Sequence, residues 1–292
     1  MLSEAVAYYH DLLNDQELAQ SSLKLLDEGL ERNKLIFGGR RLSPYLRPHF
    51  VTEEDFAQVV RVCETVWSAI EKVKDAAVAD ESLLDELGLT PIERELVKID
   101  PGYRAVSPTA RLDSFLTDET YSFVELNGES PAGIAWGDAA FEIFQELPVM
   151  KRFAEKYNVR RFEGRPLMLK VLLDCHAEFL RRKPDRAPHI AIVDLKGMPT
   201  QKEFELFREY FESEGCSSII ASPDELEFTN GRLRAGDFEI DIVYKRLLVN
   251  EYLPIMRERL KAGRGALKWN IRFQNEPAHS KGLDLDVATN HL

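Results

Sequence analysis

Four side chains that could bind a metal ion or a phosphate group lie close together near the middle of the chain. Arg111 and Asp113 belong to one run of alternating residues, and Glu125 and Asn127 belong to a second run. A polar segment, Thr117–Thr120, separates the two runs. This pattern predicts a β-hairpin whose side chains alternate between two faces, with all four of these side chains on one face.

The register of the predicted hairpin decides which side chains meet. If Thr117 pairs with Tyr121 across a tight loop, Asp113 lies opposite Glu125, and the arginine and the asparagine face each other, with Cβ atoms about 5 Å apart in each pair. Two facing carboxylates would repel each other by roughly 3 kcal/mol at an effective dielectric constant of about 20. The pair therefore needs a neutralising partner.

A divalent cation is one such partner. Mg²⁺ prefers oxygen ligands, takes one or two carboxylates from a protein and completes its octahedron with water and substrate phosphates. Asn127 adds an amide oxygen, and Arg111 adds a guanidinium that can hold phosphate. The alternative is a solvated surface hairpin whose acids pair loosely with Arg111, since exposed carboxylates are common on strands. The hairpin residues alone favour neither interpretation.

The order Arg-x-Asp, hairpin, Glu-x-Asn, followed by Pro131 and Gly133, resembles the C-terminal metal-binding signature of the ATP-grasp ligases. This superfamily includes D-alanine–D-alanine ligase and glutathione synthetase. The resemblance implies that Mg²⁺ and ATP are the cofactors, and that Arg111 steadies the acyl phosphate and the tetrahedral intermediate. It also implies that three hairpin residues hold the magnesium ions bridging the ATP phosphates: Asp113, Glu125 and Asn127.

The order of the segments resembles one branch of this superfamily. In ordinary members the signature closes the chain, whereas roughly 160 residues follow it here. That order resembles the circularly permuted ATP-grasp group, which includes glutathionylspermidine-synthase-like proteins. The segment Phe238–Leu247 resembles the "D-x-V-Y-R-R" strand of that group's flavodoxin-like segment, with Lys245 in place of the first arginine.

Two further pairs of residues are candidates for binding phosphate groups. Ser130 and Gly133 lie in a loop before a predicted helix, whose first backbone N–H groups can hold an anion, although a simple strand-to-helix turn explains them about as well. Lys245 and Arg246 form a basic cluster at the end of a predicted strand. This cluster either binds a phosphate or a substrate carboxylate or lies at a solvated sheet edge, where lysine discourages association.

The patterns predict a mixed α+β or α/β chain. Residues 1–100 are expected to be mostly helical, and residues 101–183 to form an ATP-grasp-type core with the metal-binding hairpin and helices. Residues 188–262 are expected to form a flavodoxin-like β-α-β segment, because a helix at 200–215 separates two buried-type strands. Residues 263–292 are expected to form an irregular tail.

Local signals give the individual elements. Ser3 and Asp15 are predicted N-caps, and Thr52 with Asp55 resembles a capping box. Gly38 and Gly39 are interpreted as a helix C-terminal stop. Helices are predicted from 3, from 15 to about 33, and at 52–73, 81–87, 91–99, 134–147, 151–157, 167–182, 200–215 and 253–261. Strands are predicted at 189–195, at 217–222, within 226–234 around an Asn-Gly turn, and at 238–246.

The acidic composition of the chain disfavours some classes of binding partner. The 292 residues carry 38 Lys and Arg against 50 Asp and Glu, a net charge of -12, which disfavours nucleic acid and anionic membrane surfaces. The expected partners are a small-molecule carboxylate and an amine. The three cysteines are far apart and lack C-x-x-C spacing, which predicts buried thiols. Acids near the N-terminus and the absence of a long apolar run predict a cytoplasmic protein.

The resemblance is incomplete. An ATP-grasp site also needs lysines for the α- and β-phosphates and a glycine-rich flap, which the permuted order places after Arg246. No lysine of the sequence that follows stands in a glycine-rich loop. The chain is then a fragment, is completed by a second polypeptide, or is a homologue without catalysis. The sequence predicts an ATP-dependent carboxylate–amine ligase, whole or partial. The alternatives are a noncatalytic metal- or ligand-binding homologue and a purely structural interaction protein.

Overall fold

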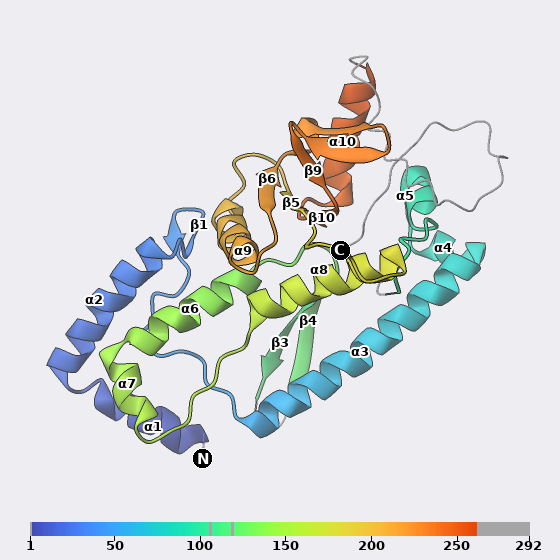
Figure 1. Cartoon of the computed structure of the whole chain (residues 1–292). Helices are drawn as coiled ribbons and strands as arrows, with labels where there is room; N and C mark the ends of the chain where they lie inside the picture. The colour runs from blue at the N-terminus through green and yellow to red at the C-terminus, as the bar shows by residue number, and fades with distance from the viewer. Residues whose placement is uncertain (1, 105–106, 118–119, 262–292) are drawn as a thin grey trace. The chain divides into compact units, whose positions relative to one another are not determined.

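The computed structural model describes residues 2–104, 107–117 and 120–261 and has a mixed α+β fold with a helical N-terminal region (Figure 1). The predicted tail at 263–292 lies outside the described residues. The helices are α1 Leu2–Leu12, α2 Gln16–Arg32, α3 Glu53–Ala79, α4 Glu81–Glu86, α5 Pro91–Leu96, α6 Ile134–Glu146, α7 Pro148–Ala154, α8 Gly164–Leu180, α9 Gln201–Ser213 and α10 Val249–Lys261, with a 3₁₀ turn η1 at Pro223–Glu225.

The strands belong to four small sheets within the described residues. Two are two-stranded, and two are three-stranded. The strands are β1 Ile36–Phe37, β2 Arg40–Arg41, β3 Arg111–Leu116, β4 Tyr121–Asn127, β5 Ile190–Val193, β6 Ser218–Ala221, β7 Leu226–Thr229, β8 Arg232–Ala235, β9 Phe238–Ile240 and β10 Ile242–Lys245.

The described residues cluster into two compact units. The first comprises residues up to 64, 132–168 and 197–210, and the second comprises 65–131, 169–196 and 211 onward. In the first unit, α1, α2, α6 and α7 pack together (Figure 1). Its aromatic core includes Tyr9 and Phe50, whose rings both contact Phe153, with centroids 5.2 and 4.9 Å away.

Two of the three predicted caps in the N-terminal region are confirmed, at Asp15 and Thr52. The prediction of Ser3 as an N-cap is wrong, because α1 begins at Leu2 and Ser3 lies within its first turn. Asp15 accepts a hydrogen bond from the Leu18 N–H at 3.1 Å, and the Thr52 hydroxyl accepts one from the Asp55 N–H at 3.0 Å. Helix α3 continues to Ala79, six residues beyond the predicted end. No helix-breaking residue intervenes before Asp80, which caps α4 instead.

The interpretation of Gly38 and Gly39 as a helix stop is wrong. Helix α2 already ends at Arg32, and the two glycines form the tight turn between β1 and β2. Their φ angles of 55° and 79° lie in the left-handed region that a two-residue hairpin turn requires and that glycine adopts without steric cost.

The predicted parallel pairing of the two strands is confirmed in the second unit. Strands β5 and β6 are parallel, with α9 between them in the chain, and β10 pairs in parallel with the other side of β5. All four residues of β5 and of β10 are buried, as expected for strands of a covered parallel sheet. Strands β7, β8 and β9 form a separate antiparallel sheet, with the predicted turn at Asn230 and Gly231.

The single strand predicted at 238–246 is wrong in detail, because the chain divides it in two. Strand β9 pairs with β8, whereas β10 joins the parallel sheet. The break falls at Asp241, whose carboxylate accepts hydrogen bonds from the His189 N–H and the Arg186 guanidinium, both at 2.8 Å. These hydrogen bonds hold Asp241 at the point where the chain passes from one sheet to the other.

Candidate functional site

The hairpin brings the four predicted side chains together in the predicted pairing. Strands β3 and β4 are antiparallel, with Arg111 opposite Asn127 and Asp113 opposite Glu125. A β-bulge follows Asp113. Cross-strand partners of an antiparallel pair lie on the same face, so the two carboxylates and the guanidinium share one surface.

The guanidinium of Arg111 is the centre of this cluster. Its Nε lies 2.7 Å from Asp113 Oδ1, and its Nη2 lies 3.1 Å from Asp113 Oδ2. The same Nη2 is 3.9 Å from Glu125 Oε1. The Asn127 amide donates to that Glu125 oxygen at 3.0 Å. Arg111 therefore supplies positive charge between two carboxylates that would otherwise repel each other.

Hydrogen bonds from Arg111 hold the pKa of Asp113 below its usual range, so Asp113 is ionised at neutral pH. The cluster is also open to solvent. The side chains of Arg111, Asp113 and Glu125 are 42%, 37% and 57% exposed. Ions and small anions can reach these charges without an opening of the fold.

The donor set of the hairpin fits Mg²⁺. Two carboxylates and an amide oxygen are ligands that Mg²⁺ accepts, and its remaining positions are commonly filled by water and phosphate oxygens. Both Asp113 oxygens accept hydrogen bonds from Arg111, so an ion bound at Asp113 would compete with the guanidinium for this carboxylate. Within the described ranges there is no group of three or more His, Cys, Asp and Glu suited to a metal. The chemistry of the hairpin side chains is therefore compatible with Mg²⁺ only if water or phosphate oxygens complete the coordination.

The other basic candidates are buried and already bound to protein atoms. Lys245 and Arg246 are 7% and 5% exposed. The Lys245 ammonium pairs with the Glu129 carboxylate, and the Arg246 Nη1 donates to the Pro131 carbonyl at 2.5 Å. Ser130 donates from its hydroxyl to the Lys245 carbonyl at 3.2 Å. The structure brings Ser130, Lys245 and Arg246 together, and the solvated-edge interpretation of the basic cluster does not apply.

Gly133 lies in the other compact unit, at the start of α6. Its φ of 105° is left-handed, and its N–H donates to Glu203 Oε1 at 2.8 Å. The Ala135 N–H donates to the same oxygen at 3.1 Å. The carboxylate of Glu203, which is fully buried, therefore occupies the position expected for an anion at this helix start. Glu203 gave no sequence signal, because an acid in the first turn of a helix is commonplace.

The carboxyl edge of the parallel sheet carries one more buried charge. Asp194 directly follows β5 and is 7% exposed, and burial raises its pKa. Ligands of open α/β sheets bind beyond the carboxyl ends of strands where the strand order reverses. In this sheet the order reverses between β5 and β10, since β6 lies on one side of β5 and β10 lies on the other.

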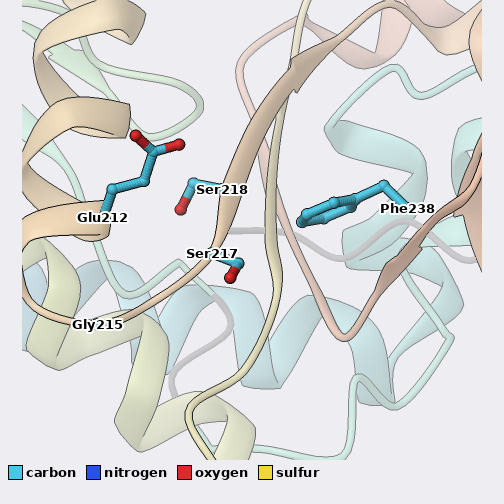
Figure 2. A pocket seen from close by; sticks show the side chains of 5 residues that line it. All are labelled: Glu212, Gly215, Ser217, Ser218 and Phe238. Atoms are coloured by element: carbon cyan, nitrogen blue, oxygen red, sulfur yellow. The ribbon is translucent and has the colours of Figure 1, made fainter.

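A shallow pocket of about 350 Å³ lies elsewhere in the second unit. Figure 2 shows Ser217 and Ser218 between Glu212 on one side and Phe238 on the other. It contains none of the residues that the sequence analysis selected. Its hydroxyls and single carboxylate do not form a catalytic arrangement.

The cysteines are free thiols in the structure. Cys216 is buried as predicted, whereas Cys63 and Cys175 are half-buried. Burial raises the pKa of Cys175 to about 11, so this thiol is protonated at neutral pH. Among the described residues, no helix combines the length and the apolar character needed to cross a membrane.

Comparison with known proteins gives a likeness of fold. No family model matches the chain, and no curated protein matches it. The chain is structurally similar to a glutathione synthetase-like effector from Globodera pallida, solved in its apo form. The TM-score is 0.51 at 18% sequence identity, over 82% of this chain and 59% of that chain. The chain thus spans less than two thirds of that protein, and the likeness concerns the fold alone.

Proposed function

We propose that the chain is a whole or partial ATP-grasp-type carboxylate–amine ligase whose β3–β4 hairpin binds Mg²⁺ together with ATP. The observation that carries the proposal is the strand pairing that sets Asp113 opposite Glu125 and Arg111 opposite Asn127. The structural likeness to a glutathione synthetase-like protein supports it. The likeness of fold would not be sufficient by itself, because one fold serves many functions.

In the proposed reaction, a substrate carboxylate oxygen attacks the γ-phosphorus of ATP, and ADP leaves. An amine then attacks the acyl carbon of the resulting acyl phosphate, and inorganic phosphate leaves. Bound Mg²⁺ would supply neutralisation of charge on the phosphate oxygens. Asp113 and Glu125 would hold the ion, and Asn127 would add its amide oxygen.

Arg111 would act on the transferring group itself. Its guanidinium now neutralises the two carboxylates, and a cation that replaces it there frees its N–H groups for phosphate oxygens. Oriented charge of this kind is the main contribution of a protein to phosphoryl transfer. Arg111 is therefore the proposed catalytic residue of this chain.

The remaining parts of the nucleotide site are a separate proposal. We propose that a second polypeptide supplies the lysines for the α- and β-phosphates. Ser130, Gly133, Lys245 and Arg246 remain candidates for phosphate contacts. Each of these residues already makes a hydrogen bond or an ion pair within the protein.

That last observation favours a second candidate function, a noncatalytic homologue that binds a metal or a ligand. In the described structure the polar groups expected to hold phosphate already bind protein atoms. The two functions differ in turnover. A noncatalytic homologue binds Mg²⁺ at the hairpin but releases no ADP from ATP in the presence of any carboxylate and amine.

Isothermal titration calorimetry with Mg-ATP tests the proposed ligase function. Wild type should bind, and Glu125→Gln should bind at least about 10-fold more weakly. Loss of a residue that holds a metal ligand in place already lowers metal affinity by about this factor, and loss of the ligand itself should lower it at least as much. Glu227→Gln is a matched control, since it removes an exposed carboxylate from strand β7. Failure of wild type to bind Mg-ATP contradicts the ligase proposal for this chain.

A further inference from the structure

The loop that leaves the hairpin is fastened to the end of β10 by three consecutive residues. Glu129 pairs through its carboxylate with the Lys245 ammonium, Ser130 donates to the Lys245 carbonyl at 3.2 Å, and Pro131 accepts from Arg246 at 2.5 Å. This loop begins two residues after Asn127. The contacts therefore bind the strand carrying two proposed metal ligands to the parallel sheet.

A second set of hydrogen bonds holds the cations in place. The Lys245 ammonium also donates to the Leu247 carbonyl at 3.0 Å, and Arg246 Nη1 donates to the Tyr244 hydroxyl at 2.9 Å. The Arg246 N–H donates to the Val193 carbonyl of β5 at 2.8 Å. Each of the two cationic groups thus contacts two protein acceptors.

Glu129 connects a third element. Its Oε1 also accepts the Val249 N–H at 3.2 Å, at the start of α10. Ser130 has a φ of 52°, a left-handed conformation that residues other than glycine rarely adopt. Such a conformation persists where surrounding contacts determine it. The loop is held in one specific shape.

Burial increases the energetic cost of losing these contacts. The Lys245 side chain is 9% exposed and that of Glu129 is 31% exposed. A buried ammonium without its carboxylate is costly, so loss of either partner disturbs the loop more than loss of a surface ion pair would. A phosphate ligand, in contrast, needs donors that are free to turn toward it.

We propose that Lys245 and Arg246 are positioning residues that clamp Glu129–Pro131 to the carboxyl end of β10 and thereby fix Glu125 and Asn127 for the ion. The clamp itself rests on the contacts above, and only its effect on metal binding rests on the proposed function. In this arrangement the basic end of β10 acts on the hairpin through the loop.

The experiment combines hydrogen exchange with Mn²⁺ binding, with Mn²⁺ as the probe for Mg²⁺. Lys245→Met should speed exchange of the backbone amides of Gly128, Glu129, Ser130 and Ala132 by at least about tenfold, because the loop loses its anchor. It should weaken Mn²⁺ binding about 10- to 100-fold, as loss of outer-shell partners does. Glu129→Gln breaks the same pair from its more exposed side and serves if Lys245→Met does not fold.

Two controls separate positioning from a general loss of stability. Lys245→Arg keeps the charge, and arginine stands at this place in the strand pattern that the segment resembles, so it should restore slow exchange and Mn²⁺ affinity. Lys196→Met removes a lysine from an exposed pair with Glu225 in the same unit and should change neither readout.

The two readouts distinguish failure of the clamp from failure of the proposed function. Unchanged exchange in both Lys245→Met and Glu129→Gln overturns the clamp. Faster exchange with unchanged Mn²⁺ affinity overturns the positioning role. If wild type binds no Mn²⁺, the proposed function fails, and faster exchange still supports the clamp.

Discussion

Asp113 lies directly opposite Glu125 in the antiparallel pair of β3 and β4. Arg111 donates two hydrogen bonds to Asp113 and lies 3.9 Å from Glu125. The guanidinium therefore has the role in this structure that the proposal gives to a divalent cation when one is bound. In the proposed site, a bound divalent cation replaces the Arg111 guanidinium as the positive partner of the two carboxylates.

Removal of the guanidinium should raise the pKa of Asp113. In Arg111→Met the carboxylate loses both hydrogen bonds and faces only the negative charge of Glu125, so its pKa should rise from the lowered value toward the ordinary range. Carboxyl-carbon NMR titration of Asp113 measures this directly. An unchanged pKa in Arg111→Met would show that Arg111 does not hold the carboxylate in solution.

The same interaction gives a pH dependence of stability with a definite sign. A carboxyl with a lowered folded-state pKa stabilises the fold above its unfolded pKa of about 3.9, and that contribution is lost as pH falls through the folded value. The stability difference between wild type and Arg111→Met should therefore be present at neutral pH and shrink below about pH 3.9. Urea denaturation across this range measures it.

The strand pairing at the site could be predicted from the sequence, but the pairing near the turn of the hairpin differs from the prediction. The assumed register of the hairpin placed Asp113 opposite Glu125, and the structure confirms this pair. The assumed pair of Thr117 with Tyr121 is wrong, because Tyr121 pairs with Leu116. The β-bulge after Asp113 adds one residue to β4 and restores the predicted pairing at the ligands. Alternation of polar and apolar residues predicts which side chains share a face of the hairpin. It does not reveal a change of register near the turn that a β-bulge cancels further along the strands.

The helix start at Gly133 carries a second prediction. Glu203→Ala removes the acceptor for the Gly133 and Ala135 N–H groups and should lower the free energy of unfolding by about 1–3 kcal/mol, the usual cost of unsatisfied buried groups. Added sulfate should stabilise this variant more than wild type, because a helix N-terminus binds anions. Chemical denaturation in sulfate and in chloride of equal ionic strength measures both effects.

Glu203→Gln provides the control, since its amide oxygen can still accept both hydrogen bonds. It should lose less stability than Glu203→Ala and should gain no extra stability from sulfate. Equal stabilisation of all three proteins by sulfate would mean that Glu203 does not occupy an anion site.

The partners of the charged candidates could not be predicted from the sequence. Glu203 binds the Gly133 N–H from 70 residues away, and Glu129 binds Lys245 from 116 residues away. No local pattern connects residues at such separations, and acids are too common in this chain to single out. Local signals therefore predicted helices, the parallel strands and the hairpin, whereas the burial of Lys245 and Arg246 depended on tertiary packing.

Close packing of α2 against α6 gives a third prediction, within the first unit. A Cβ atom at Gly29 would lie 2.6 Å from Ile143 Cγ2. Gly29→Ala should therefore destabilise the protein by about 1–3 kcal/mol through overpacking, although alanine is the better helix former by about 1 kcal/mol. Thermal or urea unfolding measures the change.

Two variants test this explanation. Gly137→Ala lies within α6, where a Cβ would meet no atom within 4 Å, and it should stabilise the protein by up to about 1 kcal/mol. The double variant Gly29→Ala with Ile143→Ala should cost less than the sum of its single changes, because the second change removes the atoms that clash. Additive costs would mean that the two residues do not meet.

The most direct test of the proposed metal site is a Mn²⁺ titration followed by electron paramagnetic resonance. Wild type should bind one ion, with Asp113 and Glu125 as ligands. The double variant Asp113→Asn with Glu125→Gln should bind at least about tenfold more weakly, and Glu227→Gln should bind as wild type does. Equal affinity of the double variant and wild type, or no binding by wild type, would contradict the assignment of the hairpin as a metal site.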